Sequence, residues 1–166
     1  MNTPEGKSKI KMNEMVDLLG ADTFNTLYTL DLTIPFRKVQ TGGSTLGYKL
    51  LSAHPALPMY KDKQYHPGNA APQYFQFDSS ATFSNEKENR IRFDKDAIDA
   101  NFDNPNKIKA FQSVDGKVWK NKPLKVKNKV IQVKNAKSGI KYEVPIYQVK
   151  IPKKTKLKIL IAFGER

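Results

Sequence analysis

Apolar and polar residues alternate with a period of two in several stretches of this chain, and this alternation constrains its fold more than any other feature. Between residues 28 and 36 every second residue is apolar, and between residues 124 and 129 lysines alternate with apolar or neutral residues. Successive side chains of a strand point to opposite faces of a sheet, so the pattern predicts strands that are buried on one face. Pro35, near the end of the first stretch, indicates an edge strand or the end of a strand.

Turn residues divide the C-terminal third of the chain into two predicted hairpins. Residues 110–114 and 117–120 flank Asp115 and Gly116, a pair that is typical of a type I′ turn. The other predicted features are a second hairpin with strands at 124–133 and 140–151 around a turn at 135–139, a last strand at 155–163, and short strands at 46–51, 74–77, 81–83 and 90–93.

Helical spacing is confined to the N-terminal segment and to one later stretch. Met15 and Leu19 can share a helix face that ends at Gly20, and Asp22 can cap a second short helix. A DNA-binding helix-turn-helix is disfavoured, because the second segment is too short and the residues beside it are not basic. Residues 96–102 are predicted to form another short helix.

We therefore expect a mostly β protein: an antiparallel β-sandwich or a closed barrel of about eight strands with one or two short N-terminal helices. A chain of 166 residues suits one domain, which we place at residues 10–166 after a flexible leader at residues 1–9. The alternation slips near residues 130–131 and again near residues 146–147. Each slip indicates either a bulge or a strand that passes from a one-sided to a two-sided environment.

Several classes of protein are excluded or disfavoured by what the sequence lacks. The absence of cysteine excludes disulfide frameworks and cysteine-ligated zinc. No apolar run is long enough to span a membrane, and no signal peptide is evident. No cofactor and no catalytic activity are expected, because the sequence contains no phosphate-cradling glycine loop, nucleophile elbow or zinc-protease motif.

Two groups of residues are weak candidates for metal binding. His54 and His66 are the only histidines, and no third ligand follows either of them at a known spacing. Four acids lie between residues 94 and 103, but the turn glycine and closing glutamate of a calcium loop are absent. We interpret these acids, Asp94, Asp96, Asp99 and Asp103, as helix-capping or solvated residues.

The segment 54–73 is rich in proline and is predicted to be irregular. A long loop of this kind inside a small domain is uncommon, and it is often functional. A tethered surface excursion explains the composition equally well, so both interpretations stay open.

Positive charge is concentrated at the C-terminal end. The chain has 29 Lys and Arg against 16 Asp and Glu. Residues 117–166 hold 15 of these bases and only two of the acids, Glu143 and Glu165, which leaves 14 of each sign for residues 1–116. A neutral front and a basic back indicate a surface that meets a polyanion. Lysines can also protect strand edges or keep a protein soluble, but a surface that serves only solubility normally mixes both signs.

The alternation predicts that the lysines of residues 124–133 and of residues 155–163 form one positive stripe, if these two strands are neighbours. Trp119 lies between two lysines and is a candidate for base stacking, although a single tryptophan in a small β protein is more often part of the core. The predicted nucleic-acid-binding residues are Lys117, Trp119, Lys120, Lys125, Lys127, Lys129, Lys134, Lys137, Lys141, Lys153, Lys154, Lys156 and Lys158.

These observations favour a non-catalytic nucleic-acid-binding protein with little sequence specificity, because lysine contacts phosphates without the rigid fork that lets arginine read bases. The partner is nucleic acid of unspecified type, with possible self-association, and the expected location is cytoplasmic. The alternative is a structural protein of a virus particle or another large assembly, located in the virion, whose basic surface faces a genome or a neighbouring subunit. An acidic protein partner is a further alternative.

Overall fold

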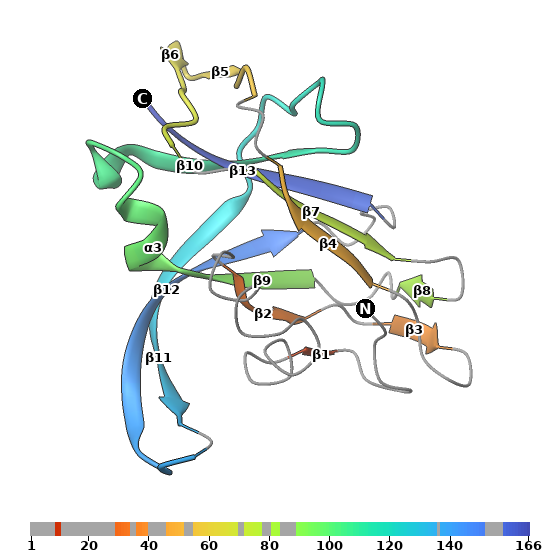
Figure 1. The fold of residues 1–166 in the computed structure, drawn as a ribbon. Coiled ribbons are helices and arrows are strands. Elements are labelled where there is room, and N and C mark those ends of the chain that lie inside the picture. Colours follow the sequence, from red (N-terminus) through yellow and green to blue (C-terminus); the bar gives the residue numbers. More distant parts are fainter. Residues whose placement is uncertain are drawn as a thin grey trace.

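The computed structural model describes residues 9–10, 29–33, 36–39, 46–51, 55–69, 72–77, 81–83, 89–135, 137–151 and 158–166 (Figure 1). All strand pairs in these ranges are antiparallel. The larger sheet has the order β1 (Lys9–Ile10), β2 (Thr29–Thr33), β9 (Asn89–Asp94), β12 (Lys141–Ile151) and β11 (Lys125–Lys134). The second sheet has the order β10 (Ile108–Ser113), β13 (Lys158–Glu165), β7 (Gln73–Phe77) and β4 (Leu46–Leu50).

Smaller elements complete the described fold. Two short pairs are β3 (Phe36–Val39) with β8 (Ala81–Phe83), and β5 (Met59–Tyr60) with β6 (Lys63–Gln64). A short helix, α3 (Lys95–Asp99), follows β9, and a 3-10 turn, η1 (Pro105–Lys107), precedes β10. The predicted short helix at residues 96–102 is therefore confirmed in α3, one residue earlier at its start and shorter at its end.

The expectation of a mostly β protein is confirmed, whereas a closed barrel is not found among the described residues. The β-sandwich stays a prediction. The predicted N-terminal helices fall almost wholly on residues outside the described ranges, and so does most of the predicted leader. Lys9 and Ile10, which are described, lie in strand β1.

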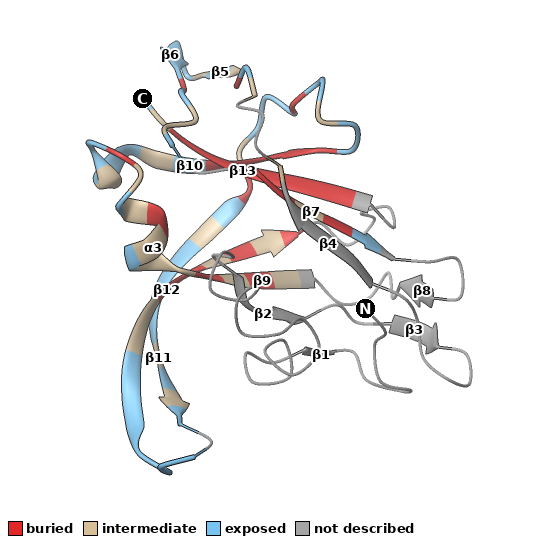
Figure 2. Cartoon of the chain, in the orientation of Figure 1, coloured by how far each residue is buried: buried red, intermediate tan, exposed pale blue. Residues whose placement is uncertain are grey.

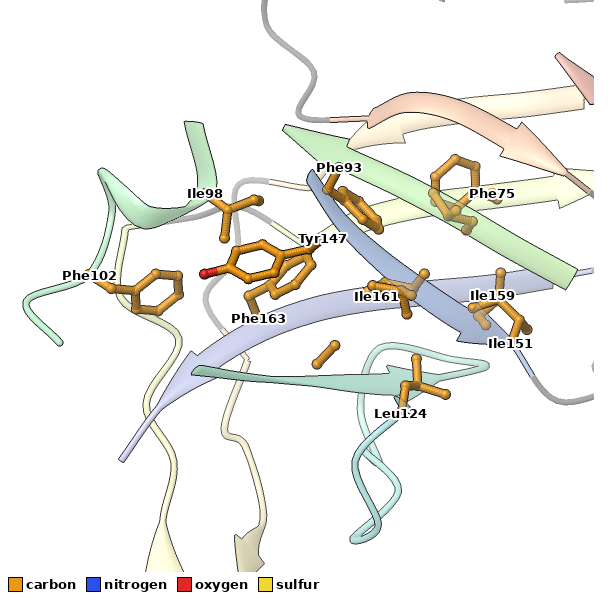
Figure 3. Close-up of a cluster of buried hydrophobic side chains, with 13 residues drawn as sticks. Phe75, Phe93, Ile98, Phe102, Leu124, Tyr147, Ile151, Ile159, Ile161 and Phe163 are labelled. Atoms are coloured by element: carbon orange, nitrogen blue, oxygen red, sulfur yellow. The ribbon is translucent and has the colours of Figure 1, made fainter. Parts of the chain in front are cut away.

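The main core cluster is made by apolar side chains from both larger sheets (Figure 3). Phe93 and Val149 come from the larger sheet and are completely buried, as is Phe75 of the second sheet. Phe93 packs edge-to-face on Phe163, with ring centroids 5.0 Å apart. Burial of each such side chain contributes about 1.5–3 kcal/mol, so this cluster is the main source of stability in the described fold.

Strand β13 is buried on both of its faces. Ile159 and Ile161 point into the main core cluster, whereas Leu160 and Ala162 belong to a second cluster on the opposite face. This two-sided burial explains why the segment is continuously apolar in sequence and why it lies inside its sheet, between β10 and β7.

The proline-rich segment 54–73 covers the second cluster. Leu57 and Tyr65 of this segment are buried there, next to Phe111. Two backbone hydrogen bonds between His66 and Glu165, at 2.7 and 2.8 Å, fix the segment to the end of β13. Within the described residues, this predicted irregular segment therefore has a structural role, and it contains the β5–β6 hairpin.

The predicted second hairpin is confirmed. β11 and β12 pair without interruption from Lys125 opposite Lys150 to Lys134 opposite Lys141. In the connecting turn, the amide of Asn135 donates to the carbonyl of Ile140 at 2.9 Å.

The bulge interpretation of the two alternation slips is wrong for the β11–β12 ladder, because its register does not shift. β12 pairs with β9 only over residues 146–151, so residues 130–135 and 137–145 extend from the body as a two-stranded arm (Figures 1 and 2). The first slip marks the point where β11 leaves the body. The second marks a two-sided environment, since Ile146 and Tyr147 are both buried.

The predicted first hairpin is wrong. β10 ends at Ser113, and residues 114–123 form an irregular loop in place of the predicted second strand at 117–120. The carboxylate of Asp115 accepts hydrogen bonds from the amides of Lys117 and Val118, at 2.9 and 3.0 Å, and these bonds compete with strand pairing. The same two donors, that of Val118 first, lower the pKa of Asp115 below its usual value.

Gly164 in β13 lies directly beneath the proline-rich segment, and this contact provides a test of the packing. A Cβ atom at this position would lie 2.3 Å from Cδ1 of Leu57 and 3.1 Å from the carbonyl oxygen of His66. We predict that Gly164→Ala lowers the free energy of unfolding by about 1–3 kcal/mol, measured by urea denaturation. The penalty should be smaller in a Leu57→Ala background, and an equal penalty in both backgrounds would contradict the packing described here.

Candidate nucleic-acid interface

A groove opens where the two larger sheets separate. β10 and β11 are the edge strands of their sheets, and they are joined by a bridge at Ala110 and Leu124, where the Leu124 amide donates to the Ala110 carbonyl at 2.8 Å. Beyond this bridge the two strands run in different directions (Figure 1). The resulting groove has a volume of about 740 Å³ and is lined by Ile108 and Lys109 of β10 and by residues 125–128 of β11.

Five lysines from four segments line this groove: Lys95 of α3, Lys109 of β10, Lys122 of the 114–123 loop, and Lys125 and Lys127 of β11. No acidic side chain is among the described residues that line it. Lys95 is neutralised by Asp99, whose Oδ2 lies 2.6 Å from the lysine Nζ. The other four lysines are exposed and make no ion pair within the described part of the chain.

Apolar side chains line the same groove. Ile108 and Val126 are half-buried and pack against the main core cluster. Tyr147 is buried beside them, and its hydroxyl donates a hydrogen bond to Oδ1 of Asp99 (Figure 3 shows the ring near α3). Burial, together with this hydrogen bond to a carboxylate, raises the pKa of Tyr147 well above its usual range. The groove therefore has an apolar floor below a basic rim.

A second, smaller cavity of about 340 Å³ continues the basic surface past the bridge. It shares Lys122 and Lys125 with the groove and adds Lys120 and Lys150. Lys150 lies directly opposite Lys125 in the β11–β12 ladder. The two cavities thus form one basic surface, which we call the lysine groove and which contains Lys95, Lys109, Lys120, Lys122, Lys125, Lys127 and Lys150.

The structure brings only some of the predicted binding residues together. Lys120, Lys125 and Lys127 lie in the lysine groove. Lys129 is exposed in β11 just before the arm begins, and Lys117 is exposed in the 114–123 loop. Lys134, Lys137 and Lys141 lie at the arm tip. Lys158 lies in β13, where the structure describes only its backbone. The other predicted lysines, Lys153, Lys154 and Lys156, are outside the described residues.

The predicted stripe across two neighbouring strands is wrong. β11 is the edge strand of the larger sheet, whereas β13 lies between β10 and β7 in the other sheet. The physical reason is that β10 and β7 occupy both hydrogen-bonding edges of β13, so no edge of β13 is left to pair with β11.

Trp119 is not available as a stacking platform. Its side chain is only 6% exposed and belongs to the second cluster, beside Phe111 and Leu160. Its indole nitrogen is buried without a hydrogen-bond partner among the described residues. The core interpretation of this tryptophan is therefore the correct one.

Sequence reasoning missed Lys95, Lys109, Lys122 and Lys150 as members of the basic surface. Lys95 and Lys109 come from the part of the chain that is neutral overall, and only the pairing of β10 with β13 and the bridge to Leu124 bring Lys109 to β11. No local signal in the sequence marks these two residues. Lys122 and Lys150 lay within the basic C-terminal segment, so its charge excess already included them.

The acidic cluster has structural roles in α3. Oδ1 of Asp94 accepts hydrogen bonds from the amides of Asp96 and Ala97, at 3.0 and 3.2 Å, and so caps the helix. Asp99 forms an ion pair with Lys95 and accepts a hydrogen bond from the hydroxyl of Tyr147. Within the described ranges, no group of three or more histidines and acids could hold a metal ion, and no helix is long and apolar enough to cross a membrane.

No protein-family model, curated protein or solved structure matches this chain. We therefore infer the function from the geometry and charge of the lysine groove.

The burial of Trp119 generates a spectroscopic prediction, since it is the only tryptophan in the chain. Its fluorescence should have the blue-shifted emission of a buried indole and should be poorly quenched by iodide. Addition of a single-stranded oligonucleotide should leave the emission unchanged, because the ring cannot reach a base. Strong quenching by either reagent would show that this side chain is accessible.

Proposed function

We propose that this chain is a non-catalytic nucleic-acid-binding protein that holds phosphates along the lysine groove between β10 and β11. The observation that carries the proposal is the convergence of lysines from separate segments on one concave surface, where Lys109, Lys122, Lys125 and Lys127 are exposed and make no ion pair among the described residues. Concave surfaces lined by one sign of charge concentrate the field and attract counter-charged ligands. Lysine supports contacts to phosphates and little base reading, so the binding should be weakly sequence-specific.

Protection of a sheet edge against aggregation explains the lysines of the groove less well than phosphate binding does. Lysines on an edge strand hinder edge-to-edge pairing, and this explains Lys125 and Lys127 on the open side of β11. It does not explain why lysines of α3 and of the 114–123 loop face the same space. Like charges held close together repel one another, and a bound polyanion removes that cost.

We further infer that the two larger sheets are the layers of a β-sandwich. The main core cluster draws its side chains from both sheets, which supports this arrangement. In such a fold the lysine groove lies at the open side of the sandwich, next to the Ala110–Leu124 bridge.

The proposal predicts a difference between two triple variants that remove the same charge. Replacement of Lys122, Lys125 and Lys127 by Gln should weaken oligonucleotide binding at least ~10-fold and flatten its salt dependence. With the four exposed lysines of the larger cavity on phosphates (Lys109, Lys122, Lys125 and Lys127), the log–log salt slope should be about −3 to −4, and its magnitude should fall by roughly 2–3 in the variant. Fluorescence anisotropy over a series of salt concentrations measures both quantities.

The matched control replaces Lys134, Lys137 and Lys141 at the arm tip by Gln and should retain most of the affinity. All six lysines are exposed, so both variants should fold with stabilities within about 0.5 kcal/mol of the natural chain. Asp99→Asn should act in the opposite direction, because it releases Lys95 while its amide oxygen can still accept from Tyr147. Equal losses in the two triple variants would mean that net charge alone, and not the groove, governs binding.

The arm favours the second candidate function, a structural protein of a virus particle or another large assembly. Its register places Ile131 opposite Val144 and Val133 opposite Tyr142 on one face, while Lys134 and Lys141 lie together on the other. Tyr142 is 44% exposed, and Ile140 near the tip is 66% exposed. An isolated two-stranded ribbon is marginally stable in water, so an apolar face on a projecting arm suits contact with a neighbouring subunit.

If the protein is a structural subunit of a large assembly, the natural chain should form oligomers without nucleic acid, and replacement of Ile140 and Tyr142 by Ser should dissociate these oligomers. Size-exclusion chromatography with light scattering over a concentration series measures the mass of both proteins. A natural chain that stays monomeric at all concentrations would eliminate this second candidate and leave the first one standing.

A further inference from the structure

We infer that the lysine groove binds single-stranded nucleic acid, with bases against its apolar floor and phosphates on its lysine rim. This inference rests on the proposed function and specifies its ligand. It is carried by the composition of the groove, where Ile108, Val126 and Tyr60 lie half-buried among the lysines.

The apolar floor distinguishes a single strand from a duplex. A duplex keeps its bases stacked inside and presents phosphates and sugars, so it would leave Ile108 and Val126 without apolar contacts. A single strand can turn its bases toward the protein, where stacking on a side chain contributes about 1–3 kcal/mol per base. Lysines on both sides of the floor can then hold the backbone of the same strand.

The size of the groove supports the same choice. Its volume of about 740 Å³ lies within the range of small-ligand sites, about 300–1,000 Å³. A cavity of this size accommodates one or two nucleotides but cannot enclose a double helix. A duplex could therefore only lie across the rim, with fewer of the lysines in reach.

Tyr60 is the aromatic residue best placed for stacking. It belongs to β5, lines the groove and is half-buried, unlike Trp119 and Tyr147, which are both 6% exposed. Nζ of Lys61 lies over one face of the Tyr60 ring, 5.4 Å from its centroid, so a base can stack only on the opposite face. Asn128, which also lines the groove, offers an amide that can donate to and accept from a base edge.

The test compares three probes of equal length with the full chain: a DNA strand of mixed sequence and roughly 16 nucleotides, its duplex with the complementary strand, and the same strand with abasic sites in place of the bases. Fluorescence anisotropy at one fixed salt concentration should show that the single strand binds about 10-fold tighter than the duplex and the abasic strand. A peptide of glutamates with a similar charge should bind more weakly than the single strand.

Three variants test the stacking residue. Tyr60→Ala should lose about 10-fold in affinity for the single strand and little for the abasic strand, since only the former offers bases. Tyr60→Phe should retain affinity. Tyr60→Leu keeps an apolar side chain against the second cluster and should still lose affinity, which separates the loss of the ring from a loss of folding. Thermal melting of each variant verifies its fold.

The possible outcomes separate this inference from the proposed function. Equal affinity for the single strand, the duplex and the abasic strand overturns the inference but leaves a phosphate-binding groove. Equal binding of the glutamate peptide and the single strand overturns the inference in favour of an acidic protein partner. Absence of binding to all nucleic-acid probes overturns both this inference and the proposed function.

Discussion

The arrangement of the described strands depends on the burial of β13 on both of its faces. Ile159, Ile161 and Phe163 face the main core cluster, and Leu160 and Ala162 face the second. This strand lies inside its sheet, where β10 and β7 pair with its two edges and satisfy its buried backbone groups. β10 thereby becomes an edge strand, and the Ala110–Leu124 bridge brings it next to β11. The lysine groove is thus a consequence of how the most apolar strand is buried.

The lysine groove and the arm are two separate products of the same hairpin. Near the body, β11 contributes Lys125 and Lys127 to the rim while Val126 packs toward the core. Beyond residue 129 the hairpin leaves the body, and its apolar residues no longer have a layer to cover them (Figure 2). One segment therefore serves a basic concave surface at its base and an amphipathic projection at its tip. These are different binding properties, which explains why a charge excess alone does not distinguish the two candidate functions.

Local sequence patterns were sufficient to predict those strands and turns that depend mainly on contacts between residues near one another in the sequence. The β11–β12 hairpin could be predicted because its alternation and its turn at residues 135–139 agree. The predicted hairpin with strands at 110–114 and 117–120 does not form. Asp115 accepts hydrogen bonds from backbone amides of its own loop, and Trp119 packs in the second cluster. The dipeptide Asp115-Gly116 does lie at a bend of the chain, but a turn dipeptide does not determine whether a second strand follows it.

The lysine groove could be predicted only in part, because it is made by contacts between residues that are distant in the sequence. The C-terminal charge excess indicated Lys120, Lys125 and Lys127, which the structure places in the lysine groove. It could not indicate Lys95 and Lys109, which lie in a segment with balanced charge, nor exclude the arm-tip lysines. Strand order decides which lysines share a surface, and strand order follows from the packing of both core clusters rather than from any local pattern.

The most direct test of the central claim is an NMR titration of the isotope-labelled chain with a short single-stranded oligonucleotide, followed by amide chemical shifts. We predict that the shift changes concentrate on residues 108–109, 122 and 125–128, on both sides of the lysine groove, while residues 134, 135 and 137–141 at the arm tip stay unchanged. Shifts confined to the arm, or spread evenly over exposed lysines of both regions, would contradict it.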